Sequence, residues 1–187
     1  LYGEVHGLKK DENGNGLNGA LIGLFCSDET AFTADTAIRT TVSSEDGAFT
    51  FTGIPYGNWI VREIEVPVGY VMSDVSYPVT IDADGTVVEV EIINTVIRGN
   101  VQLTKTDKDY PDNTLAGAEF EVYEDAKGNK KLDGDDVLLG ELQELSGGVY
   151  QMDSLVFGGY FVKETVAPQG FFLDDTAYYF EITENGK

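Results

Sequence analysis

Apolar and polar residues alternate along several short stretches of this 187-residue chain. The alternation is clear over residues 48–52, 59–63 and 87–93, where Thr, Val, Ile, Tyr and Phe are enriched. A period of two places every second side chain on the same face, which is typical of a β-strand with one buried face. Turn-forming sequences such as Glu45-Asp46-Gly47 interrupt these stretches. Short strands at this spacing predict an all-β fold of two packed sheets.

The chain also contains an internal repeat. Val5-His6-Gly7-Leu8-Lys9 resembles Val101-Gln102-Leu103-Thr104-Lys105, 96 positions later. Residues 59–70 resemble residues 160–171, at an offset of 101. The offset drifts only between the predicted strands, as expected for two copies of one domain that differ in loop length.

We place the domain boundary near Ile97, which predicts one β-sandwich at residues 1–97 and a second at residues 98–187. The connection is too short for a flexible linker. An offset of 101 puts the counterpart of Asn94 outside these 187 residues. We therefore expect the second copy to be truncated before its last strand.

Composition excludes some classes of protein. The chain has 33 acidic and 12 basic residues, for a net charge of −21, and such a surface repels nucleic acid. No apolar run approaches the roughly 20 residues of a membrane span. No signal peptide is visible, so we expect a fragment of a longer protein. The single cysteine, Cys26, cannot form an internal disulfide, so stability must have another source.

Three polar residues of the first copy fall on strand faces that the alternation assigns to the core. Glu63 shares a face with Val61, and Asn94 continues the apolar face of the last strand. Lys9 takes the inward position on the first strand, whereas Lys10 points outward. A charged group in a core needs a partner or a change of protonation state.

Two interpretations of this cluster are open. One is a buried Lys–Glu ion pair with a hydrogen bond from the asparagine. The other is covalent: burial favours the neutral amine of Lys9, which can attack the side-chain carbonyl of Asn94. A protonated Glu63 would activate that carbonyl and carry protons to the departing ammonia. The product would be one isopeptide bond.

The order of these residues carries a family resemblance. The specific part is an aromatic residue, then x-Val-x-Glu-x-x-x-Pro-x-Gly and a second aromatic residue, which stands at 59–70 and again at 160–171. With a lysine on the first strand and an asparagine on the last, this pattern resembles the CnaB-type domains of Gram-positive pilins and adhesins. That group includes the B repeats of collagen adhesins and the SpaA-type pilin modules. Two copies cover nearly the whole chain.

The resemblance implies Ig-like sandwiches of about seven strands, joined internally by a Lys–Asn isopeptide bond that a glutamate catalyses. It implies isopeptide residues Lys9 and Asn94 with catalytic Glu63 in the first copy, and Lys105 with catalytic Glu164 in the second. The chain departs from the family at Gly7, where an apolar residue is usual.

The function that the resemblance implies is a structural stalk or shaft module of a secreted, cell-wall-anchored pilin or adhesin. Its partners would be neighbouring domains of the same surface protein or pilus. It would not be an enzyme, beyond forming its own bond. An alternative is an adhesive module that binds a host protein or glycan, which a contiguous exposed aromatic or apolar patch would favour.

One loop has a spacing of acidic residues similar to that of a calcium loop. Its candidate ligands are Asp125, Asn129, Asp133 and Asp136. The third position is lysine and the sixth is not glycine, so a solvated hairpin loop is the alternative. No other cofactor is indicated, and the single histidine, His6, supports neither a catalytic triad nor a zinc site.

Overall fold

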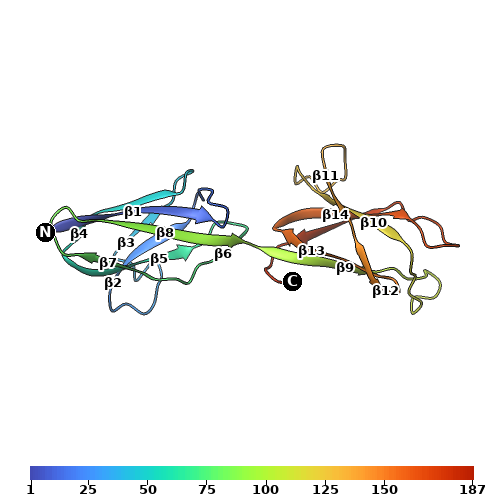
Figure 1. The fold of residues 1–187 in the computed structure, drawn as a ribbon, viewed down its shortest axis with the longest axis horizontal. Coiled ribbons are helices and arrows are strands. Elements are labelled where there is room, and N and C mark those ends of the chain that lie inside the picture. Colours follow the sequence, from blue (N-terminus) through green and yellow to red (C-terminus); the bar gives the residue numbers. More distant parts are fainter. The chain divides into compact units, whose positions relative to one another are not determined.

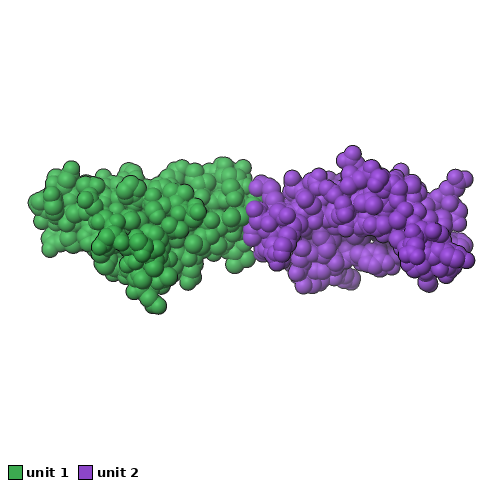
Figure 2. Space-filling model, turned by 90° about the horizontal axis from the view of Figure 1, so that it is seen from below, with its two compact units in different colours: residues 1–96 green, residues 97–187 purple.

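The computed structural model describes residues 1–187 as two compact units, Leu1–Val96 and Ile97–Lys187 (Figure 2). Each unit consists of strands and loops (Figure 1), so the predicted all-β class with two tandem sandwiches is confirmed. The chain has no helix of the length and apolarity that a membrane crossing requires.

The first unit is a sandwich of two four-stranded sheets, with orders β4-β1-β8-β6 and β3-β2-β5-β7. Neighbouring strands are antiparallel except β1 and β8, which pair in parallel from Glu4 opposite Val87 to Asp11 opposite Asn94. The first and last strands of the unit therefore lie side by side. The strands are β1 (Tyr2–Asp11), β2 (Leu21–Cys26), β3 (Arg39–Val42), β4 (Ala48–Pro55), β5 (Gly57–Glu65), β6 (Tyr70–Val71), β7 (Tyr77–Ile81) and β8 (Val87–Val96).

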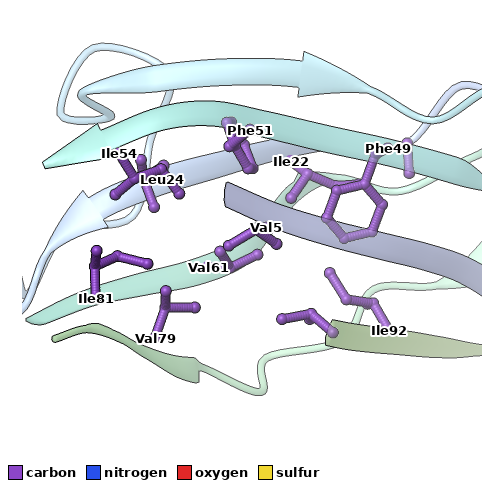
Figure 3. Packing of buried hydrophobic residues seen from close by; sticks show 12 residues of the cluster. Val5, Ile22, Leu24, Phe49, Phe51, Ile54, Val61, Val79, Ile81 and Ile92 are labelled. Carbon is purple, nitrogen blue, oxygen red and sulfur yellow. The ribbon is translucent and has the colours of Figure 1, made fainter. Parts of the chain in front are cut away.

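The core of the first unit fills the space between these sheets (Figure 3). Both sheets contribute alternate side chains, as the period of two predicts. Complete burial of one such side chain stabilises the fold by about 1.5–3 kcal/mol. The buried residues are Val5, Ala20, Ile22, Leu24, Phe49, Phe51, Ile54, Val61, Val79, Ile81, Val90 and Ile92.

The unusual glycine of the first strand, Gly7, is explained by its partner across the ladder. Gly7 lies opposite Phe49 of β4, and a Cβ atom at Gly7 would stand 2.0 Å from the Phe49 ring. The ring thus occupies the volume that a side chain on β1 would need. The core remains filled although β1 has no inward-facing apolar side chain between Val5 and Lys9.

The second unit repeats this architecture with fewer strands. Its sheets have the orders β11-β10-β14-β15 and β12-β13-β9, and every pair is antiparallel. The counterpart of β1 is β9, which pairs only with β13. The strands are β9 (Arg98–Thr104), β10 (Glu119–Glu124), β11 (Val137–Glu141), β12 (Gln143–Ser146), β13 (Val149–Val156), β14 (Gly158–Val166) and β15 (Ala177–Ile182).

The second core is separate from the first and is more aromatic. Tyr150 and Tyr160 are its largest fully buried side chains. The Tyr150 hydroxyl accepts a hydrogen bond from the Ala118 amide at 2.9 Å, and the Tyr160 hydroxyl donates to the Val156 carbonyl at 2.7 Å. Each buried hydroxyl is therefore satisfied, as a buried polar atom must be.

The substitution Gly7→Val should destabilise the first unit by about 1–3 kcal/mol, because the added side chain collides with the Phe49 ring. Adding Phe49→Ala should recover part of this loss by opening the space. Denaturant unfolding measures both effects, and Leu8→Val on the exposed face of the same strand is the control. Equal midpoints for Gly7→Val and the unchanged protein would contradict this packing.

Candidate functional site

Two facing sheets bring the three polar residues of the first unit together. Lys9 on β1 and Asn94 on β8 come from adjacent strands of one sheet, and Glu63 on β5 comes from the other sheet. Their exposed fractions are 0% for Lys9, 1% for Glu63 and 2% for Asn94. As the alternation predicts, all three side chains lie inside the sandwich.

Glu63 lies between the lysine and the asparagine. The Asn94 Nδ2 atom donates to both carboxylate oxygens of Glu63 at 3.0 Å. The Lys9 ammonium lies 3.7 Å from Glu63 Oε1 and donates to the Ile92 carbonyl at 3.3 Å. Asn94 Oδ1 is buried and accepts no hydrogen bond. The carboxylate therefore contacts the nitrogen that would leave and also faces the amine that would attack.

Burial controls the charge of the lysine. Removal from water lowers the pKa of Lys9 below its ordinary value of 10.5, and the nearby Glu63 carboxylate opposes this shift. Because the desolvation effect is the larger, a greater fraction of Lys9 than of an exposed lysine is in the neutral amine form at a given pH. A neutral amine has the free electron pair that a nucleophile requires.

The neighbouring lysine, Lys10, lies on the outer face of the sheet. Its side chain points outward and forms an ion pair with Glu91 of β8. It does not contact Glu63 or Asn94. The outward orientation follows from its position one residue after Lys9 on the same strand.

In each unit a backbone amide also holds the glutamate, a contact that the sequence analysis did not predict. The Ser73 amide donates to Glu63 Oε2 at 3.0 Å, and the Asp174 amide donates to Glu164 Oε2 at 2.8 Å. In each unit the donor follows its glutamate by ten residues. A backbone donor needs no particular side chain, so only this equal spacing could have indicated it.

The second unit brings together the two residues that the sequence predicts there. The Lys105 ammonium lies 2.9 Å from Glu164 Oε1, and the side chains are 18% and 2% exposed. Apart from this ion pair, Glu164 Oε1 is buried without a hydrogen-bond partner. The pair lines an open cavity of about 340 Å³. No asparagine contacts this glutamate: Asn185 accepts a hydrogen bond from the Arg98 amide at the other end of β9.

The acidic loop of the second unit is closed by its own hydrogen bonds. The Asp125 carboxylate accepts from the amides of Asn129 and Lys130, at 3.1 and 2.9 Å. Asp136 accepts from the Asp133 amide, and Asn129 donates to Asp133. No three acidic, histidine or cysteine side chains of the chain converge as a metal site requires. These hydrogen bonds close the segment as a hairpin loop, and calcium binding by it stays a prediction.

Residues 3–96 and 99–187 each match the SpaA family of prealbumin-like fold domains. The chain belongs to this family. The two matches cover nearly all of both units, so the resemblance to CnaB-type and SpaA-type modules is confirmed. No curated protein sequence matches the chain.

Solved structures support the SpaA-type fold. The Bacillus anthracis TIE protein matches with a TM-score of 0.83 and 24% identity, over 100% of this chain and 32% of that protein. A C-terminal fragment of the pilus adhesin SpaC from Lactobacillus rhamnosus GG matches with a TM-score of 0.57 and 14% identity, over 98% of this chain and 82% of the fragment. A streptococcal ancillary pilin matches with a TM-score of 0.47 and 23% identity, over 100% of this chain and 61% of that protein. The chain therefore spans about a third of the TIE protein and about three fifths of the ancillary pilin.

The burial of Lys9 predicts a pH dependence in the variant Asn94→Ala, in which the amine has no carboxamide to attack. Between the lowered pKa of folded Lys9 and its ordinary value of 10.5, the unfolded chain binds more protons than the folded chain. Stability of the first unit should therefore rise with pH across this window. Denaturant unfolding from neutral to alkaline pH measures the slope, and adding Lys9→Met should remove this contribution. A slope that is unchanged by Lys9→Met would contradict the burial effect.

A second pKa prediction concerns Asp174, which lines the cavity of the second unit together with Tyr178. The Tyr178 hydroxyl donates to Asp174 Oδ2 at 2.7 Å and, as the largest cause, lowers the pKa of Asp174 to about 2. Tyr178→Phe should move this pKa back toward 3.8. The contribution of Asp174 to stability is complete above its unfolded pKa and is lost as the pH falls toward 2. NMR titration of the carboxylate measures the shift; an unchanged value in Tyr178→Phe would exclude this hydrogen bond as the cause.

Proposed function

We propose that the chain is a structural stalk or shaft segment of a Gram-positive surface protein, and that its first unit cross-links itself between Lys9 and Asn94. The observation that carries this proposal is the buried cluster in which Glu63 contacts the Asn94 amide nitrogen and faces the Lys9 amine. Membership of the SpaA family supports the structural role.

The reaction begins with a proton transfer. In the buried site the Lys9 ammonium passes a proton to the Glu63 carboxylate, which gives a neutral amine and a neutral acid. The Nζ electron pair then attacks Asn94 Cγ, and Oδ1 takes the negative charge. The two reactants are held in one core, so no entropy of association opposes this step.

Glu63 then moves the protons that complete the exchange. It gives its proton to Nδ2, which it already contacts, and takes one from the attached Nζ. The carbonyl reforms, the Cγ–Nδ2 bond breaks and ammonia leaves. The products are one secondary amide, one ammonia and a regenerated Glu63 acid. No oxidant, metal or external reactant is required.

The position of this bond suits a part that bears tension. The first unit begins at β1 and ends at β8, and these strands are parallel neighbours. Tension applied to the two ends of the unit would be transmitted from the residues before Lys9, through the proposed bond, to the residues after Asn94. Residues 10–93 would then lie outside the covalent path of the load. A hydrogen-bonded ladder alone would have to resist the same pull without a covalent bond.

The burial of the cluster argues against an enzyme that acts on an external substrate. Both the Lys9 and Glu63 side chains are 0% exposed, so a substrate in solution does not reach them. The chemistry is therefore confined to the unit itself. We further infer an extracellular, cell-wall-anchored location, with neighbouring domains of the same surface protein or pilus as partners.

An adhesive role that recognises a host protein or glycan is the alternative. Exposed apolar residues would favour it, and the second unit carries Phe171, Phe172 and Leu173 on its surface.

The purified protein should weigh less than its sequence mass by one ammonia, with Lys9 and Asn94 in one branched proteolytic peptide. Glu63→Gln should restore the sequence mass, because the amide cannot exchange protons as the acid does. Lys9→Ala and Asn94→Ala should do the same by removing a reactant, whereas Lys10→Ala should keep the bond. Intact-mass and peptide mass spectrometry test whether the bond forms. The full sequence mass in the unchanged protein would contradict cross-linking and favour the buried Lys–Glu ion pair.

The cross-link should also stabilise the first unit against unfolding. Closing the loop from Lys9 to Asn94 restricts the unfolded chain, which corresponds to roughly 4 to 5 kcal/mol in the chain-entropy treatment. The melting temperature of Glu63→Gln should therefore fall well below that of the unchanged protein. The control is the same substitution in a Lys9→Ala background, which reports its local effect without any cross-link. If both backgrounds lost the same stability, the bond would contribute nothing.

A further inference from the structure

The backbone of Lys9 is held on both sides, one residue beyond the ladder between β1 and β4. That ladder ends at Leu8 opposite Ala48. The Lys9 amide then donates to the Gly47 carbonyl at 2.7 Å, and the Lys9 carbonyl accepts from the Leu17 amide at 2.9 Å. Both backbone polar groups of Lys9 are therefore occupied by residues that lie outside β8.

Gly47 can approach Lys9 closely because it has no side chain. Its φ of +82° lies in the left-handed region, and a Cβ atom there would stand 2.1 Å from the Lys9 carbonyl oxygen. Any side chain at this position would push the lysine backbone away. The turn that contains Gly47 therefore sets one side of the contact around Lys9.

Ser43 holds the segment on the other side of Lys9. Its hydroxyl donates to the Leu17 carbonyl at 2.7 Å and accepts from the Ala20 amide at 3.0 Å. Its own amide donates to the Ala20 carbonyl, and its carbonyl accepts from the Gly19 amide, both at 3.0 Å. Ser43 is 1% exposed, so loss of the hydroxyl would leave a buried donor and a buried acceptor unpaired.

The second unit forms the same contacts around its own lysine. The Lys105 amide donates to the Gly148 carbonyl, and the Lys105 carbonyl accepts from the Leu115 amide, both at 2.8 Å. The Tyr150 hydroxyl accepts from the Ala118 amide at 2.9 Å and donates to the Leu115 carbonyl at 3.2 Å. The internal repeat equates each of these backbone partners with its counterpart in the first unit.

The hydroxyl group comes from a different place in each unit. Ser43 follows β3 directly, whereas Tyr150 lies on β13, the counterpart of β4. The repeat places Phe49 at the Tyr150 position, and Phe49 has no hydroxyl. Two different side chains thus satisfy the same pair of backbone groups. The feature that the units share is the shape of this segment, and in both units the segment binds the backbone of the lysine.

We propose that Ser43 is a positioning residue for the cross-link of the first unit, a role that rests on the proposed function. Through the segment of residues 17–20, its hydroxyl fixes the Lys9 backbone. The Lys9 amine then lies 3.7 Å from Glu63 Oε1, on the strand next to Asn94. A lysine side chain has several rotatable bonds, so a fixed backbone limits the conformations in which the amine misses its partners.

The test measures the rate of bond formation in the full chain after a pulse of cell-free synthesis. Intact mass at successive times follows the loss of one ammonia, and circular dichroism confirms that each variant is folded at the temperature used. Ser43→Ala should slow the loss at least about tenfold, because a small displacement of a reacting group is costly in rate. Equal rates in Ser43→Ala and the unchanged protein would overturn the proposal.

Two matched controls separate positioning from stability. Thr40→Ala removes an exposed hydroxyl from β3 and should leave the rate unchanged. Ile81→Val creates a small cavity in the core and lowers stability, but Figure 3 shows Ile81 at the end of the core opposite Phe49 and Ile92. Its rate should also be unchanged. If Ile81→Val slowed the reaction as much as Ser43→Ala, the effect would be one of stability, and the proposal would be wrong.

A second measurement tests the backbone contacts without the bond. In the Asn94→Ala background, which lacks the carboxamide, Ser43→Ala should speed hydrogen exchange at the Lys9 and Leu17 amides at least about tenfold. Thr40→Ala in the same background should not. Unchanged exchange at both amides would show that Ser43 does not hold the lysine backbone, whatever the rate of bond formation.

The two proposals fail on different results. The full sequence mass in the unchanged protein would overturn the cross-link itself and, with it, the positioning role. If the bond forms in the unchanged protein but Ser43→Ala changes neither its rate nor the exchange of the two amides, only the positioning role of Ser43 fails.

Discussion

The parallel pairing of β1 with β8 is the constraint on which the rest of the first unit depends. Parallel strands cannot be joined by a hairpin, so this pairing requires the intervening strands to fold around it. It sets Lys9 and Asn94, which are far apart in the sequence, on adjacent strands opposite Glu63. The same pairing places both ends of the unit on neighbouring strands. One arrangement therefore provides the groups of the proposed cross-link and the direction of the load that the proposed role implies.

The buried cluster of Lys9, Glu63 and Asn94 is unfavourable in its unreacted form, and the proposed reaction would relieve it. Unreacted, it leaves Asn94 Oδ1 without a partner and keeps the Lys9 amine out of water. Both features reduce stability. The proposed conversion to an amide would remove the ionisable amine from the core and release ammonia to solvent. The burial that weakens the unreacted fold is thus the same property that would activate the amine in the proposed reaction.

Local patterns predicted much of this arrangement, and the failures have a common cause. The inward faces of Lys9 and Glu63 follow from alternation along single strands, which depends only on the chain itself. The place of Gly7 depends on a ring from another strand, and the support of Glu63 comes from the Ser73 backbone amide. Neither is visible without the tertiary structure. In the acidic loop, the residue types suit calcium, but loop closure directs Asp125 toward backbone amides.

The two units carry the same residue pair but bury its lysine to different extents. Both carry a lysine and a glutamate at equivalent positions, and both hold the glutamate by a backbone amide ten residues later. The Lys9 side chain is fully buried on β1, which pairs with β8, whereas the Lys105 side chain is 18% exposed. The lysine and the glutamate alone therefore do not create the desolvated site. In the first unit β8 pairs with the strand of Lys9 and carries Asn94, so one strand contributes to the burial of the amine and also supplies the carboxamide that the proposed bond requires.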